Sequence, residues 1–357
     1  MDSTPETFDP STALRSEPPP AAPFTLRKVF MGPFGLRAGW SLLIYFALFA
    51  SVAVAIRTVQ HRIKAHHAAS ANSTAQAAPA KPAASEPQKI KPFLIGESIN
   101  FAIPLLLSLL MAVIERRRIG VFGLGGQHFL HRFLHGAFWG LAALSLLVAL
   151  LYGFHLLTFD KLLDHGPAIL GWGALQLLGF LLVGLFEEYF FRGYFQFTLT
   201  RGMVWLGELI SKSHARSIAF WIASFITSAL FLVAHTGNPG EDKFGLISVF
   251  LAGVVFVVAL WRTGSLWWAI GFHMAWDWAQ SFLYGVPDSG QLVQGRLFAT
   301  HASGNVLLSG GTVGPEGSVL LVPVMALVIV VLLYTHPSPQ PPLETKPAKL
   351  APPELIA

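Results

Sequence analysis

The sequence contains no cysteine at all. This absence excludes disulfide bonds, thiol nucleophiles, cysteine-ligated zinc and lipid-modified cysteine. Charged residues are also scarce, at 12% of the chain, whereas a soluble globular domain carries about 25%. Hydrophobic residues, by contrast, make up 53% of the 357 residues. The composition therefore favours a chain that lies mostly within a membrane.

Long apolar runs follow one another along the chain, and each is close to the ~20 residues that cross the core of a bilayer. These runs predict an all-α, polytopic transmembrane bundle of about eight helices. Their approximate ranges are 38–56, 93–114, 133–156, 168–191, 217–236, 244–262, 265–284 and 317–335.

The segments outside the apolar runs predict the domain organisation. Residues 1–35 are proline-rich and lack the pattern of a signal peptide, which indicates a flexible cytoplasmic tail. The bundle spans 36–335. It is interrupted at about 63–92 by a stretch rich in Ala, Pro, Ser and Lys that is typical of a disordered loop. Residues 336–357 form a second flexible tail.

The basic residues indicate a topology and exclude nucleic acid as a partner. The net charge is +5, but Lys and Arg flank the apolar runs and form no single stripe. Alternating helices place 14 of the 24 Lys and Arg on the side of both termini and nine on the other, six of these in or beside the first loop; Arg192 belongs to a motif and is set aside. The bias favours both termini inside, although the basic first loop opposes it. We expect a multi-pass protein of a bacterial inner membrane, with the lipid bilayer as its surroundings.

Three ionisable residues lie inside the fourth apolar run, where each costs about 2.5–3.5 kcal/mol on insertion scales. Glu188 and Arg192 are four residues apart, so they share a helix face and can pair. Glu187 lies about 100° further round the helix and is not satisfied by that pair. One carboxylate can therefore be structural while the other acts as a general base. The alternative is a salt bridge that only stabilises the helix.

Two later runs add a histidine at a helix end and a histidine with an acid. His235 ends the fifth run, where a cap or interfacial role is the ordinary alternative. His273 and Asp277 are four residues apart in the seventh run and point to one face. Carboxylate and imidazole groups can bind a divalent metal such as zinc and leave a position open for water. Without a metal, Glu187 can deprotonate water while the other groups stabilise an oxyanion. Either route hydrolyses an amide bond at the membrane.

The three motifs Glu187-Glu188-x-x-x-Arg192, Phe231-x-x-x-His235 and His273-x-x-x-Asp277 resemble the signature of the CPBP family. This family comprises intramembrane CAAX proteases and bacteriocin-processing enzymes, also called Abi. The resemblance covers roughly residues 168–284.

The resemblance implies a metalloendopeptidase that acts on a membrane-associated protein or peptide, including prenylated CAAX-type substrates. It implies that Glu187 activates water, that His235, His273 and Asp277 complete the site, and that Glu188 and Arg192 support it. It also makes Glu187, His235, His273 and Asp277 candidate zinc ligands, although a metal-free glutamate mechanism is argued for the same family.

The sequence lacks the motifs of other classes of membrane protease. There is no His-Glu-x-x-His, no Gly-x-Gly-Asp, and no Gly-x-Ser-Gly around Ser303. His301 and Ser303 are interpreted as loop residues, and Pro315 and Glu316 as the opening of the last helix. Two alternatives stay open: a proton-coupled transporter that uses the Glu/His/Asp set as a relay, and a non-proteolytic immunity or assembly factor of the same family.

Overall fold

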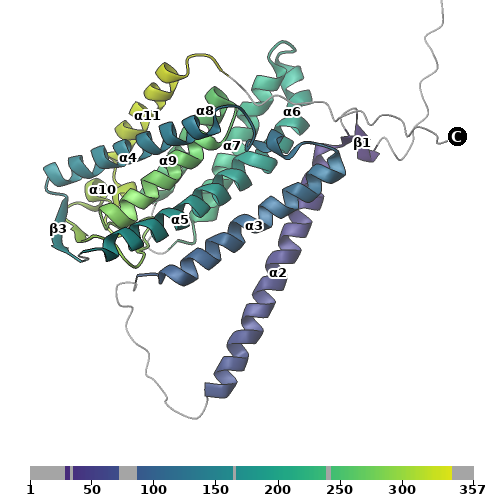
Figure 1. The fold of residues 1–357 in the computed structure, drawn as a ribbon. Helices are drawn as coiled ribbons and strands as arrows, with labels where there is room; N and C mark the ends of the chain where they lie inside the picture. Colours follow the sequence, from purple (N-terminus) through teal and green to yellow (C-terminus); the bar gives the residue numbers. More distant parts are fainter. Residues whose placement is uncertain (1–28, 33–34, 72–86, 164–165, 239–242, 340–357) are drawn as a thin grey trace, which may run out of the picture.

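The structure is a computed structural model, and it describes residues 29–32, 35–71, 87–163, 166–238 and 243–339. Helices dominate this part of the chain (Figure 1). The α-helices are α2 (Ala38–Ala71), α3 (Ile90–Glu115), α4 (Phe129–Gly153), α5 (Ala168–Glu188), α6 (Gln196–Ile210), α7 (Ala215–His235), α8 (Lys243–Thr263), α9 (Trp267–Trp278), α10 (Val306–Ser309) and α11 (Leu321–Thr335).

Short elements connect or extend these helices. The 3-10 turns are η2 (Ile119–Phe122) and η5 (Pro315–Gly317), and the π-helical segments are η3 (Tyr189–Phe195) and η4 (Ala279–Leu283). Strands β1 (Met31–Gly32) and β2 (Gly35–Leu36) pair antiparallel. So do β3 (Leu157–Leu162) and β4 (Phe298–Ala302), with a register irregularity between Phe159 and Lys161. These pairs are too small to change the fold class.

The prediction of an all-α polytopic bundle is confirmed. Within the described ranges, six helical stretches are long and apolar enough to cross a membrane. The last two predicted spans are shorter helices than expected: 265–284 corresponds to α9 continued by η4, and 317–335 to the 15-residue α11. The chain is therefore an integral, multi-pass membrane protein.

Two predicted boundaries differ from the structure. The loop expected at about 63–92 begins later, because α2 continues to Ala71 through an alanine-rich stretch of high helix propensity; residues 72–86 lie outside the described residues. The fourth span does not end near 191 but continues through η3 and α6 to Ile210. The polar residues of α6 hid this extension, because helical hydrogen bonds do not require apolar side chains. Most of the two predicted tails also lies outside the described residues.

Glycines allow the central helices α4 and α9 to approach closely. A side-chain Cβ at Gly140 would lie 2.2 Å from the carbonyl oxygen of Phe272, and one at Gly271 would lie 2.1 Å from that of Phe133. Small residues at such contacts are the usual means of packing helices within a membrane. The contact fixes the height and rotation of α9, which carries His273 and Asp277.

A buried polar network joins α3, η3, α6 and the segment after α3. Glu115 accepts hydrogen bonds from Tyr194 (2.7 Å) and Arg117 (3.1 Å) and pairs with Arg201 at 3.3 Å. Two arginines therefore compensate one buried carboxylate, as a low-dielectric interior requires. The network attaches the long α5–η3–α6 helix to its neighbours on the side away from His235.

We predict that Gly140→Leu lowers the melting temperature of the purified protein in detergent, because the new side chain collides with the α9 backbone. Overpacking of this kind typically costs about 1–3 kcal/mol. Gly153→Leu on the same helix is the matched control, since a Cβ there meets nothing within 4 Å. Equal melting temperatures for the two variants would show that the α4–α9 contact is looser than described.

Candidate active site

The first predicted motif lies where α5 passes into the π-helical segment η3. Glu188 and Arg192 form the predicted ion pair at 3.2 Å, and both side chains are fully buried. The Arg192 guanidinium also lies over the rings of Phe231 and Phe256, at 4.2 and 5.4 Å from their centroids. Such cation–π contacts add attraction where water is excluded. The pair and its aromatic surroundings hold this part of the helix in one position.

A π-helical segment inside an α-helix often marks a functional site, because the wider turn redirects side chains. Here the backbone of Gly193 leaves the helical region, with φ −79° and ψ −112°. A Cβ at this position would lie 2.9 Å from the ring of Tyr189 and 3.0 Å from the carbonyl oxygen of Phe122. The glycine therefore permits the kink beside Arg192.

His273 lies among three carboxylates. Its Nδ1 is 3.2 Å from Glu188 Oε1, and its Nε2 is 3.7 Å from Glu187 Oε2 and 3.5 Å from Asp277 Oδ2. The imidazole stacks on the ring of Phe256 at 4.9 Å. Ionised carboxylates only accept hydrogen bonds, so a ring that carries protons on both nitrogens satisfies this arrangement best.

His235 approaches Glu187 from the end of α7. Its Nδ1 lies 2.8 Å from the carbonyl oxygen of Phe231, which fixes the proton on Nδ1 and leaves Nε2 as an acceptor. Nε2 is 3.9 Å from Glu187 Oε2, an atom that has no hydrogen-bond partner. Two acceptors thus face each other across a gap. The gap suits a molecule that donates protons to both of them.

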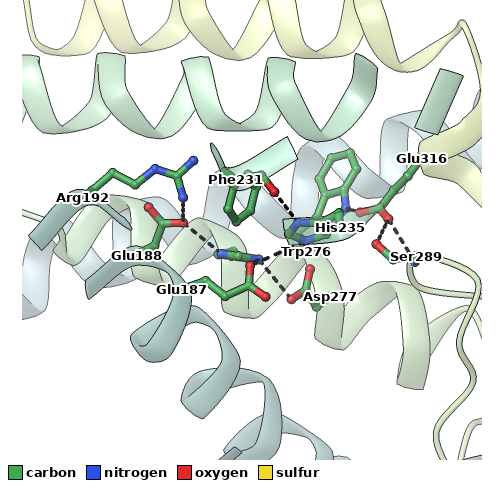
Figure 2. A network of polar contacts seen from close by, with 10 residues as sticks. Glu187, Glu188, Arg192, Phe231, His235, Trp276, Asp277, Ser289 and Glu316 are labelled. Atoms are coloured by element: carbon green, nitrogen blue, oxygen red, sulfur yellow. Dashed lines mark hydrogen bonds and ion pairs between the residues drawn. The ribbon is translucent and has the colours of Figure 1, made fainter. Parts of the chain in front are cut away.

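Figure 2 shows that these side chains converge from three helices, α5 with η3, α7 and α9. The structure therefore brings together all six predicted site residues. The side chains of Glu187, His235 and His273 remain 18%, 15% and 11% exposed, whereas Glu188 and Arg192 are fully buried. The partly exposed side chains of Glu187, His235 and His273 line the cavity, whereas the buried Glu188–Arg192 pair does not.

A cavity of about 490 Å³ holds the accessible groups. Phenylalanines form much of its wall, including Phe186 and Phe190 on the α5–η3 helix and Phe49 on α2. Its polar lining includes Glu97 and Asn100 of α3. An apolar wall with a few convergent polar groups is typical of a substrate site.

Sequence reasoning missed part of this cavity. Glu316 was interpreted as opening the last helix; instead it lies in η5, ahead of α11, and one carboxylate oxygen accepts a hydrogen bond from Trp276 Nε1 at 3.1 Å. The other oxygen accepts from the backbone N–H and the hydroxyl of Ser289, both at 3.1 Å. Asp288 also lines the cavity. No motif marks these residues, because they reach the site from a segment outside the three signatures.

The predicted zinc ligands share only Asp277 with the closest group of metal-ligating side chains among the described residues. Among the described residues, the one set of three or more such side chains whose ligand atoms all lie within 4.8 Å of one another is Asp277, Asp288 and Glu316. Glu187 Oε2 lies 3.9 and 3.7 Å from the Nε2 atoms of His235 and His273, and these three residues are not part of that group. The zinc set therefore stays a prediction.

We predict that Arg192→Met strongly destabilises the protein, because it leaves the Glu188 carboxylate buried without its partner. Breaking a buried pair in this way costs about 3–5 kcal/mol. The double variant Glu188→Gln/Arg192→Met should recover part of the loss, since no charge is then stranded. The measurement is thermal unfolding in detergent. A double variant less stable than Arg192→Met alone would contradict the pairing.

Comparison with known proteins gives one family match. Residues 167–279 match the family model described as type II CAAX prenyl endopeptidase Rce1-like. No curated protein and no solved structure matches the chain. The matched segment begins just before α5 and ends just after α9, so it contains all three motifs. Residues 167–279 are thus similar to type II CAAX prenyl endopeptidases, which agrees with the resemblance of the three motifs to the CPBP family.

Proposed function

We propose that this protein is an intramembrane endopeptidase in which Glu187 activates the hydrolytic water and His235, His273 and Asp277 complete the site. The family match over residues 167–279 supports an endopeptidase of the CAAX type in general. The observation that supports the assigned roles is Glu187 Oε2, which faces two imidazole nitrogens at 3.7 and 3.9 Å and has no hydrogen-bond partner.

The chemical step uses Glu187 first as a base and then as an acid. The carboxylate takes a proton from water while the water oxygen bonds to the carbonyl carbon of the scissile peptide bond. The carbonyl oxygen becomes an oxyanion. Collapse of this intermediate breaks the C–N bond, and Glu187 returns the proton to the leaving amine nitrogen. The products are a new carboxyl group and a new amine, and water is the only reactant besides the peptide.

The two histidines have different roles in this step. His235 Nε2 accepts a hydrogen bond from the water and orients it toward Glu187, since its Nδ1 proton is held by the Phe231 carbonyl. His273, protonated on both nitrogens, supplies a positive N–H for the oxyanion. Glu188 holds the ring of His273 in place and Arg192 compensates the charge of Glu188. Asp277 restrains His273 from the next turn of α9.

We expect Glu187→Gln to lower the rate of peptide cleavage at least 100-fold while the protein remains folded, because general acid–base catalysis contributes roughly 10²–10⁴-fold. His235→Ala and His273→Ala should lower the rate as well. The assay incubates purified protein in detergent with transmembrane and lipidated peptides and identifies the products by mass spectrometry.

The matched control is His301→Ala. His301 pairs with Asp160 at 2.8 Å on the exposed pair of strands β3 and β4 and lies outside the cavity, so this variant should cleave at the wild-type rate. If Glu187→Gln cleaved peptides at the wild-type rate, the proposed role of Glu187 in catalysis would be wrong. Treatment with a chelator, followed by readdition of zinc, tests the metal: loss and recovery of cleavage would establish a metal requirement.

A further inference from the structure

A second cavity, of about 110 Å³, lies between η2, α6, the start of α7 and the end of α8. No described residue lines both this cavity and the catalytic one. Helix α7 packs against both α6 and α8 here (Figure 1). Gln196, which lines the cavity, joins α6 to α7, because its side-chain amide donates to Ser224 at 2.8 Å and accepts from Thr227 at 3.2 Å. The cavity is therefore held open by specific packing, and the proposed reaction does not use it.

Three arginines line this cavity, and its described lining contains no Asp or Glu. We call it the arginine cavity. Arg201 pairs with Glu115 at 3.3 Å, and the fully buried Arg192 pairs with Glu188 at 3.2 Å. Within the described part of the chain, Arg192 Nε and Nη2 have no hydrogen-bond partner. Arg216, in the first turn of α7, is exposed and forms no ion pair with a described residue. The lining therefore favours a ligand that carries negative charge on oxygen atoms.

An apolar strip on the outer face of α7 continues from the arginine cavity. It consists of Ile218, Trp221, Ile222 and Phe225, and Ser217 lies in both the strip and the cavity. Trp221 and Phe225 are 41% and 65% exposed. The strip follows the helix for roughly 12 Å at 1.5 Å per residue. Exposed apolar side chains are ordinary on a membrane-spanning helix, but this strip begins beside a cavity lined by arginine.

Two tryptophans indicate the depth of this site in the membrane. Trp261 lines the arginine cavity and Trp221 belongs to the strip, and their rings lie 5.5 Å apart. Tryptophan is enriched where the hydrocarbon core meets the polar headgroups. The arginine cavity is therefore at the level of the headgroups, and the strip leads from it toward the hydrocarbon.

We propose that the arginine cavity and the strip together bind one anionic phospholipid. The phosphate lies beside Arg216, with the hydroxyl of Ser217 and the unpartnered, buried hydroxyl of Thr200 as further donors. One acyl chain follows the strip along α7. A zwitterionic lipid fits less well, because its ammonium group meets arginines and no acid of the described lining. Basic pockets between membrane-spanning helices are known to bind anionic headgroups in this way.

Lipid binding is measured on delipidated protein in detergent, by native mass spectrometry and by thermal unfolding. The probe is phosphatidylglycerol, and phosphatidylcholine with the same acyl chains is the comparison. We expect phosphatidylglycerol to form a one-to-one adduct and to raise the melting temperature, because a ligand that binds only the folded state stabilises it. Phosphatidylcholine should bind at least fivefold more weakly. No adduct, or equal binding of the two lipids, would overturn the proposal.

Arg216→Gln should weaken the binding of phosphatidylglycerol about fivefold, which is the contribution of one basic residue near a membrane surface. Lys212→Gln is the matched control. It removes the same charge from the turn between α6 and α7, but Lys212 does not line the cavity. Both side chains are exposed, so neither substitution should disturb folding. Equal weakening by the two variants would mean that general surface charge attracts the lipid, and the assigned site would be wrong.

Inorganic phosphate and glycerol phosphate separate a headgroup site from a lipid site. At the concentration of phosphatidylglycerol that saturates binding, we expect neither to raise the melting temperature, since neither reaches the strip. If either raised it as much as the lipid does, the cavity would be a site for a free anion and the assignment to a lipid would be overturned. These measurements follow lipid binding and not cleavage, so they do not depend on the proposed peptidase function.

Discussion

The buried Glu188–Arg192 pair is the interaction on which the rest of the site depends. A single ionised group in the membrane interior is costly, so each must be compensated by a neighbour. Arg192 compensates Glu188, and Glu188 in turn fixes Nδ1 of His273. That contact directs Nε2 of the ring toward Glu187 and Asp277. One ion pair therefore positions the accessible groups without itself reaching the cavity.

Close backbone contact gives this polar cluster a rigid frame. The glycines between α4 and α9 bring the helices together, and Gly193 permits the kink beside Arg192. Helices that pack on backbone atoms have few alternative rotations, because any shift creates a collision. The imidazole of His273 consequently meets the Glu188 carboxylate of α5 at hydrogen-bonding distance. Helix packing and electrostatic contacts therefore both constrain the position of α9.

The cavity combines the proposed catalytic residues with further acids. Glu316 and Asp288 add negative charge beside Asp277, and the hydrogen bonds of Glu316 join the segments around η4 and η5 to Trp276 on α9. These residues lie outside the segment that matches the family model. The three predicted motifs therefore lie within the matched segment, while the later segments give this cavity its additional acids.

The sequence by itself determined the helical membrane fold and the ion pair, since apolar length and a four-residue spacing are local properties. It also identified four ionisable residues within apolar runs, namely Glu187, His235, His273 and Asp277. Only the tertiary structure decided that these groups meet and that Glu316 lines the same cavity. Those facts depend on the packing of helices far apart in the chain, which residue spacing within one helix does not encode.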